Sequence, residues 1–316
     1  MKNRLSLFTI FMLLTSLITA QVNYQNQEHD NTSYDTTYES LIKKLFARKN
    51  TLQDTVEYWK IGGNGNVNFS QVHFSDNWNK GGISSLSLLT DLGIFANYTI
   101  GKSSWENNLD YNYGIIKSGE QNLRKNEDKI EMNSKFGQKA FSNFFYSFLV
   151  NLQTQLFDGY DYIESDGLDS SVLASGIFSP AYLIISIGMD YRPTDNFTIL
   201  LSPLTSKTTF VLRDNVPVQK YGIKPGENNR KEIGAFMKAK HLWEITEDVS
   251  WENKLDLFTN YLDQPEKIDV NWESKLFLKV NEFLATTISA NLIYDYDQDD
   301  EIQFKEALAV GFSYKF

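Results

Sequence analysis

The chain has 316 residues, contains no cysteine and has a formal net charge of −10, from 30 basic and 40 acidic side chains. The acidic balance argues against a nucleic-acid-binding protein and against a polybasic protein of membrane surfaces. Because an exported chain without cysteine has no disulfides to stabilise it, its fold must depend on an extensive hydrogen-bonded framework.

The first twenty residues have the layout of a secretory signal peptide. Lys2 and Arg4 precede an apolar run from Leu5 to Ile18, and Ala20 is a small residue at the expected cleavage site. The run is shorter than the roughly 20 residues that a helix needs to span a bilayer, which disfavours an N-terminal anchor. We therefore expect residues 1–20 to be removed on export.

Residues 21–60 are expected to form a periplasmic leader. The segment is polar, and Leu41, Ile42, Leu45 and Phe46 at helical spacing predict a short amphipathic helix within it. Two roles are open: a leader that lies against the mouth of a barrel, or a plug or partner-binding helix.

From residue 61 onward the sequence alternates strands and turns. The expected strand at 85–100 places Leu86, Leu88 and Leu92 on one face and Ser87 and Asp91 on the other. The same alternation recurs at 105–115, 144–156, 183–191 and 268–280. Because half of each such strand is polar, membrane-spanning strands are compatible with the negative mean hydropathy of −0.37.

The last strand, at 302–316, has the longest alternation. Its even positions include Phe304, Leu308 and Phe312, its odd positions are polar or small, and the pattern runs to the final residue, Phe316. A barrel needs such a strand last, to close its sheet and to present apolar side chains to lipid. This pattern also predicts that the insertion machinery of the outer membrane recognises the strand ending at Phe316.

About twelve strands are expected, joined by short turns that alternate with longer connections such as 119–127, 158–178 and 213–230. This is the asymmetry of outer-membrane barrels, with short turns and both chain ends in the periplasm. The sequence therefore predicts an all-β fold: a transmembrane antiparallel up-and-down barrel over 61–316 in a bacterial outer membrane.

Three details depart from a regular strand pattern. The first expected strand, at 67–74, mixes its faces, and the glycine-rich stretch Gly62-Gly63-Asn64-Gly65 is interpreted as a turn. Pro203 interrupts a strand where the ladder wants a donor, which predicts a bulge or a bend.

The polar faces of the strands are rich in charges of both signs, and these faces are expected to point inward. The lumen-lining candidates are Glu106, Asp110, Lys135, Asp190, Arg192, Lys254, Asp256, Glu273, Lys275 and Lys305. Such a lumen either selects and orients a solute or is filled by its own ion pairs. Twelve strands lie between packed small barrels and open large ones, so both interpretations stay open.

No catalytic, metal or cofactor site is expected. The three histidines, His29, His73 and His241, have no spacing typical of a nucleophile and base, so a membrane-embedded hydrolase is the least favoured class. The acidic stretch at 294–301 lacks the ligand spacing of an EF-hand and is interpreted as a solvated loop. The expected partner is the lipid bilayer, with no nucleic acid and with an unidentified solute.

Several stretches near the turns resemble a family of exported Bacteroidota proteins, the domain of unknown function 3078 family. They are NWNKGG at 77–82, RKNEDK at 124–129, FSPAY at 178–182, LSPLTSKTTF at 201–210 and Tyr221-Gly222. The resemblance implies an outer-membrane barrel and brings no catalytic or binding residues.

The same stretches suggest candidates for an outer mouth: Trp78, Arg124, Lys125, Asp128 and Tyr182. They form either a recognition or constriction surface, or the turn and bulge chemistry that the barrel requires. The expected function is a small-solute channel or porin-like path. The alternative is a closed structural barrel that binds a partner or a glycan through its outer loops.

Overall fold

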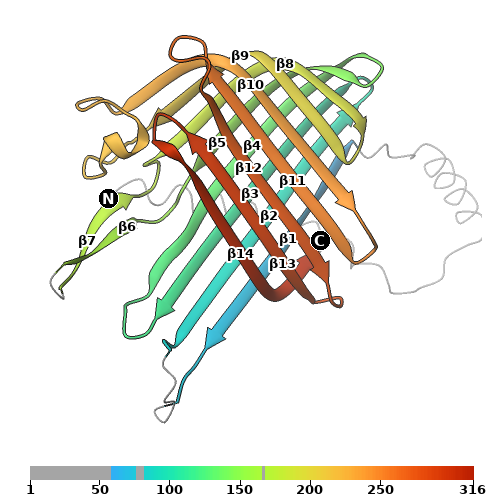
Figure 1. Ribbon diagram of the computed structural model, residues 1–316. Coiled ribbons are helices and arrows are strands. Elements are labelled where there is room, and N and C mark those ends of the chain that lie inside the picture. The colour runs from blue at the N-terminus through green and yellow to red at the C-terminus, as the bar shows by residue number, and fades with distance from the viewer. Residues whose placement is uncertain (1–57, 76–81, 166–167) are drawn as a thin grey trace, which may run out of the picture. The chain divides into compact units, whose positions relative to one another are not determined.

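The computed structural model describes residues 58–75, 82–165 and 168–316, and these contain twelve long strands that close into one antiparallel barrel (Figure 1). The barrel strands are β1 (Trp59–Val72), β2 (Ser85–Ile100), β3 (Ser103–Ser118), β4 (Arg124–Phe141), β5 (Phe144–Thr154), β8 (Ala181–Thr194), β9 (Phe197–Phe210), β10 (Asn229–Glu244), β11 (Val249–Asn260), β12 (Ile268–Lys279), β13 (Leu284–Asp295) and β14 (Asp299–Lys315). Each pairs with its neighbours in the chain, except that β5 pairs with β8 and β1 closes on β14. The predicted fold class is confirmed.

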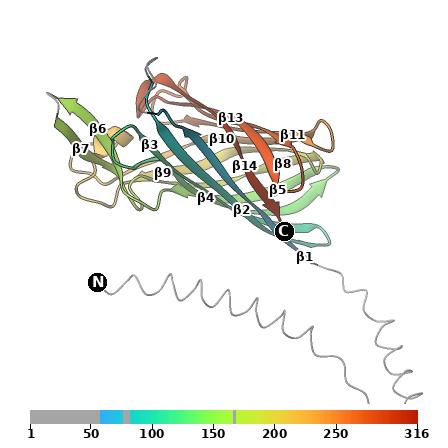
Figure 2. The same cartoon turned by 90° about the horizontal axis from the view of Figure 1, so that it is seen from below.

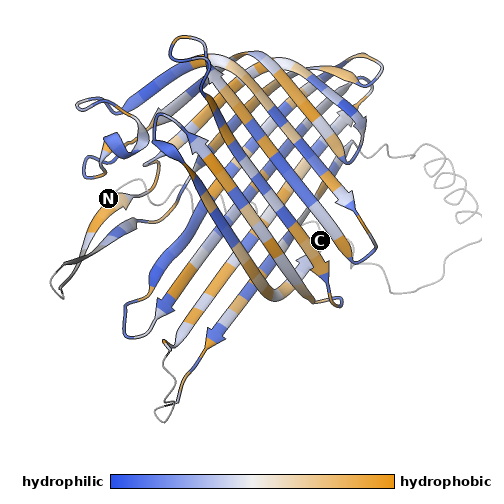
Figure 3. Cartoon of the chain, in the orientation of Figure 1, coloured by the Kyte–Doolittle hydropathy of each residue, from blue (hydrophilic) through white to orange (hydrophobic). Residues whose placement is uncertain are grey.

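The outer face of the barrel is apolar. Hydropathy alternates along the strands (Figure 3), and on β14 the side chains of Leu308 and Phe312 are 70% and 68% exposed. In water a continuous band of such side chains would be unfavourable, whereas a bilayer removes it from water at ~25 cal/mol per Å². With all twelve barrel strands paired into a closed sheet, this face defines an outer-membrane β-barrel.

Aromatic side chains gather at the end of the barrel where the short turns lie, called here the short-turn end. Trp59 packs against Tyr98 and Trp105 at ring distances of 5.1 and 6.0 Å, and Trp243 packs against Trp251 at 6.2 Å. Amphipathic rings favour the membrane–water interface, so this cluster marks one boundary of the embedded band. The opposite end, with the longer connections, is called the long-loop end.

The glycine-rich stretch 62–65 belongs to strand β1, so its interpretation as a turn is wrong. A Cβ on Gly62 would lie 2.8 Å from the ring of Phe95, and one on Gly63 would lie 2.6 Å from the ring of Phe316. Glycine is needed here because aromatic rings cover the backbone, not because the chain reverses. The expected first strand, at 67–74, therefore begins too late: β1 begins at Trp59.

The closure of the barrel is short. β1 and β14 pair over five residue pairs, from Asn64 with Lys315 to Asn68 with Gly311, whereas β1 and β2 pair over fourteen. Gly63 and Phe316 add two backbone hydrogen bonds of 2.9 and 3.0 Å at the short-turn end. Phe316 thus takes part in closing the wall.

Pro203 lies in a β-bulge of β9, as its sequence position predicts. Against β10 the register passes from Thr205 opposite Gly234 to Ser202 opposite Phe236, and so skips Pro203 and Leu204. A bulge accommodates a residue that has no N–H to donate to the ladder.

The connection 158–178 is not the plain loop that the sequence suggests. It holds a separate hairpin of β6 (Gly159–Ser165) and β7 (Leu168–Ser175), which lies beside the connection 211–228 with its short helix η1 (Val218–Tyr221) (Figures 1 and 2). The hairpin β6–β7 was not predicted because its residues are polar and alternate too weakly to give the period-two pattern of a strand.

The predicted signal peptide, the leader helix and Trp78 lie outside the described residues. Among the residues that the structure describes, no helix is long and apolar enough to cross a bilayer.

Candidate functional site

All ten lumen-lining candidates form ion pairs. The pairs that join non-neighbouring strands must cross the interior of the barrel, because the outer face is the apolar one. These interactions fall into three groups, at successive heights along the axis.

The first group lies near the short-turn end around Asp190, whose side chain is fully buried. Its carboxylate accepts hydrogen bonds from Lys135 and from Nε of Arg192, both at 2.7 Å, and from the hydroxyl of Thr198 at 2.6 Å. Glu106 of β3 pairs with Arg192 and, at 3.2 Å, with Lys135. A carboxylate removed from water is tolerated here because several charge-assisted donors converge on it.

The second group crosses the middle of the lumen. Lys129 of β4 pairs with Glu273 of β12, and Asp110 of β3 lies 3.7 Å from Lys254 of β11. In the closed order of twelve strands, the two members of each pair lie on opposite walls. Lys238 of β10 extends this row, because its ammonium contacts Asp256 at 2.8 Å and Glu131 at 3.6 Å.

Two further pairs lie to one side of this row. Lys275 of β12 lies 3.8 Å from Asp91 of β2, and Lys305 of β14 pairs with Glu127 of β4. These lysine side chains are more exposed than those around Asp190.

The barrel also contains an apolar cluster that is not among the residues predicted from the sequence. Leu149, Leu200, Phe236 and Phe258 pack together, and Leu149 and Leu200 are only 1% and 2% exposed. A lipid-facing side chain would be exposed, so these point inward. Their positions gave a signal, since Phe236 shares its strand face with Lys238, and Phe258 shares its face with Asp256.

A third charged group closes over this cluster towards the long-loop end. Lys207 of β9 contacts Asp269 at 2.5 Å and Asp295 at 3.1 Å, and its ammonium lies 5.2 Å from the ring centroid of Phe258. Nearby, Arg230 pairs with Glu232 at 3.1 Å and with Asp297 at 3.1 Å.

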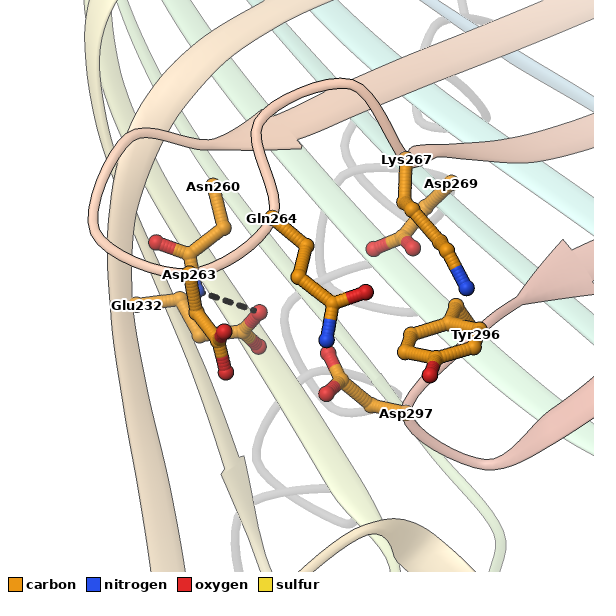
Figure 4. Close-up of a pocket in the computed structure, with 8 residues that line it drawn as sticks. All are labelled: Glu232, Asn260, Asp263, Gln264, Lys267, Asp269, Tyr296 and Asp297. Carbon is orange, nitrogen blue, oxygen red and sulfur yellow. Dashed lines mark hydrogen bonds between the residues drawn. The ribbon is translucent and has the colours of Figure 1, made fainter.

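Figure 4 shows the pocket at this end, lined by carboxylates and amides of β10, β11, β12 and two connections, together with Lys267 and Tyr296. The ammonium of Lys267 lies 3.1 Å from the ring centroid of Tyr296, and the cavity measures about 20 Å³. A cavity of that size holds about one water molecule, so it is not a solute site.

The outer-mouth candidates divide into two places. Lys125 donates to Asp128 at 2.8 Å and to the carbonyl of Phe157 at 2.6 Å, and Asp128 accepts from the backbone N–H groups of Leu156 and Phe157. Arg124 stacks over Tyr162, 3.9 Å from its ring centroid. These contacts anchor the chain as it leaves β5 for β6, which favours the interpretation as turn chemistry.

Tyr182 takes part in a different contact. Its hydroxyl group donates a hydrogen bond of 3.1 Å to Gln298, in the turn between β13 and β14. Since β8 and β13 are five places apart in the strand order, this bond spans the long-loop end over the apolar cluster.

The connection 211–228 has a small core of its own. Val211, Val216, Tyr221 and Ile223 pack with Leu173 of β7, and the Tyr221 hydroxyl donates to the carbonyl of Ala174 at 2.8 Å. Burial, aided by the negative charge of Asp161, raises the pKa of Tyr221 to about 12. The hairpin and the connection therefore form one packed unit at the long-loop end.

The two histidines among the described residues, His73 and His241, lie outside these groups. His73 is an exposed residue beyond β1, and His241 lies on the outer face, where its ring packs edge-on against Phe197 at 5.8 Å.

The described residues thus define an outer-membrane β-barrel with a charged interior. A model of the family described as "Protein of unknown function (DUF3078)" matches residues 69–160. The match agrees with the resemblance inferred from the sequence over β1 to the start of β6. No curated protein matches the chain.

Solved outer-membrane barrels are similar to the chain at low identity. The translocator domain of the autotransporter NalP from Neisseria meningitidis is 9% identical, with a TM-score of 0.38 over 89% of this chain and 96% of that one. An outer-membrane channel from Pseudomonas putida F1 is 10% identical, with a TM-score of 0.36 over 83% and 98%. The NanC porin is 8% identical, with a TM-score of 0.37 over 79% and 98%. Scores of this size carry no argument about activity.

Proposed function

We propose that the barrel is a path for small hydrophilic solutes across the outer membrane. The observation that carries the proposal is the solvent exposure of inward charges. The side chains of Asp110 and Lys275 are 41% and 42% exposed, although each forms an ion pair inside the wall. Charged groups in a lumen keep this exposure only where water has room beside them.

The exposure is uneven in a way that favours a path over a filled interior. Around Asp190 the charged groups are buried against one another. Asp110 and Lys275, which come from strands on different walls, are exposed. A lumen filled throughout by its own side chains would bury both groups alike.

Conductance in a planar bilayer tests the proposal. The purified barrel should give reproducible current steps in potassium chloride. A preparation that is folded, as judged by a heat-dependent shift on a denaturing gel, but passes no current would overturn it.

The second candidate is a closed barrel that binds a partner through its outer loops. It is favoured by the packed unit of the hairpin β6–β7 and the connection 211–228, because such loops need no core merely to connect strands. Deleting residues 159–175 separates the two: a path should still conduct, whereas a partner-binding barrel should lose its partner in a pull-down from the outer membrane.

The proposal assigns no catalytic role to the barrel, and a hydrolase centred on His73 is disfavoured. Lipid hydrolysis that is lost in His73→Ala would reverse this assignment.

Export and insertion complete the proposal. Residues 1–20 act as the signal peptide of a bacterial, Bacteroidota-like exported protein, which N-terminal sequencing of the mature chain tests. The last strand is the signal for the insertion machinery in this proposal, and the hydrogen bonds of Phe316 to Gly63 close the wall beside it. Deleting Phe316 should lower the inserted fraction, and an unchanged yield of heat-modifiable protein would refute that role.

A further inference from the structure

We propose that the solute path occupies only one side of the lumen, against β12, β13, β14, β1 and β2, and that it suits neutral or zwitterionic polar solutes. The inference rests on the proposed function and adds to it the position and lining of the path.

The row of ion pairs across the middle divides the interior. Lys129 with Glu273 and Asp110 with Lys254 both join opposite walls, so their side chains meet near the barrel axis. One side of this row is enclosed by β5, β8, β9, β10 and β11, and the other by β12, β13, β14, β1 and β2.

The first side is filled. Leu149, Leu200, Phe236 and Phe258 come from β5, β9, β10 and β11, and all are buried. The Asp190 group adjoins them, because Asp190 pairs with Leu200 and Lys135 pairs with Leu149, and the Lys207 group lies towards the long-loop end. The hydrogen bond from Tyr182 to Gln298 runs from this side to the turn between β13 and β14 at the long-loop end. No straight route for a solute passes through side chains packed in this way.

The second side has a wall of small side chains. Ser313 of β14 pairs with Asn66 of β1, and Ala307 pairs with Ser289 of β13. These residues share the inward face with Lys305 and Lys275, because paired residues lie on the same side of a sheet. These small side chains are too short to reach the axis, and only the ion pairs Lys275–Asp91 and Lys305–Glu127 are described across the space that they leave.

The lining of this space predicts the solute class. Lysine and carboxylate groups face it as pairs, Lys275 with Asp91 and Lys305 with Glu127, and the small-residue wall adds the amide of Asn66 and the hydroxyls of Ser289 and Ser313. Paired charges give little net field along the path, so ions of either sign gain no advantage. A solute that carries both signs, or hydrogen-bonding groups without charge, matches this lining.

Cysteine substitution tests the position of the path cleanly, because the chain contains no cysteine of its own. Ser289→Cys and Ala309→Cys place a thiol on the small-residue wall. Ser186→Cys places one in the filled side, where the residue is 1% exposed and its hydroxyl has no hydrogen-bond partner to lose. Ala290→Cys, one residue from Ser289, faces lipid and serves as a second control.

Each variant, in vesicles, is treated with a membrane-impermeant cationic methanethiosulfonate. Modification is read as a mass shift and as single-channel current. We expect Ser289→Cys and Ala309→Cys to be modified with loss of most of the current, and Ser186→Cys to react only after heat denaturation, since a buried thiol is reached only through opening of the fold. Heat-modifiability on a gel verifies that each variant is folded.

Modification of Ser186→Cys as fast as that of Ser289→Cys would overturn the one-sided path. So would protection of both wall positions. An unmodified protein that passes no current would instead overturn the proposed function, while the labelling pattern would still decide where water fills the lumen. The two failures are therefore distinguishable. Reversal potentials in a salt gradient near zero support the solute class, and a strong preference for either ion overturns it.

Discussion

The ammonium group of Lys129 and the carboxylate of Glu273 meet across the interior of the barrel, although β4 and β12 lie on opposite walls. This pair ties together two parts of the wall that share no backbone hydrogen bond. It therefore contributes to the stability of the closed form in a way that strand pairing cannot.

Removing one partner should be costlier than removing both. Lys129→Gln leaves Glu273 partly buried with one cation fewer, so we expect unfolding to be easier by about 1–3 kcal/mol. The double variant with Glu273→Gln should recover part of this loss, with a coupling of ~0.5–3 kcal/mol. Urea unfolding of the barrel in vesicles measures both, and additive effects would show that the pair contributes nothing.

Neutralising a lysine beside the path should make the barrel prefer cations. In Lys275→Gln the carboxylate of Asp91 keeps its charge without the ammonium 3.8 Å away, which leaves a negative field in the path. The reversal potential in a potassium chloride gradient should shift in the cation-selective direction. Lys102→Gln, an equal charge change in the short turn between β2 and β3, is the control and should shift it little.

Truncating the inner apolar cluster should destabilise the barrel strongly. Phe258→Ala removes a buried ring on which Leu149, Leu200 and Phe236 pack, so we expect a loss of ~3–5 kcal/mol. Leu308→Ala on the lipid-facing side creates no internal cavity and should cost less. Equal losses in the two variants would show that the cluster is not a packed core.

Alkaline pH should loosen the unit formed by the hairpin and the connection 211–228. The folded state raises the pKa of Tyr221 from 10.0 to about 12, so the stability that its neutral form contributes is complete below pH ~10 and is lost as the pH rises through 12. Between these two pH values the Tyr221 hydroxyl ionises when the connection is open but stays neutral when the connection is packed.

The phenolate absorbance of the parent minus that of Tyr221→Phe gives the titration of this one group. Its midpoint should lie near 12 rather than 10.0. A midpoint at the ordinary value would mean that the hydroxyl is not buried against Ala174 in solution. Limited proteolysis of the connection at rising pH provides an independent measure of its opening.

The wall of the barrel could be predicted from the sequence, but most of its interior could not. The alternation along 302–316 predicts which side chains face lipid. Pro203 predicts a bulge, because proline has no N–H to donate to the hydrogen-bond ladder. Alternation also placed all ten charged candidates on faces where the structure finds ion pairs.

What lies opposite a residue across the lumen depends on strand order, tilt and closure, which no local pattern contains. Lys129 and Glu273 are 144 residues apart in the chain, and nothing near either one indicates the other. Phe236 and Phe258 follow the inward face, yet a period of two cannot say whether an inward ring meets water or another ring. The local sequence did not show the role of Gly62 and Gly63 for a related reason, because the rings of Phe95 and Phe316 that cover them come from distant parts of the chain.

The short closure between β1 and β14 gives the wall a preferred line of opening. Five residue pairs join β1 to β14 at this seam, whereas fourteen join β1 to β2. Separating β1 from β14 therefore breaks fewer hydrogen bonds than separating β1 from β2. Backbone amides of the seam should exchange with solvent before those of β2 and β3. The barrel can therefore be regarded as a curved sheet that is closed by one short pairing, between its first strand, β1, and its last strand, β14.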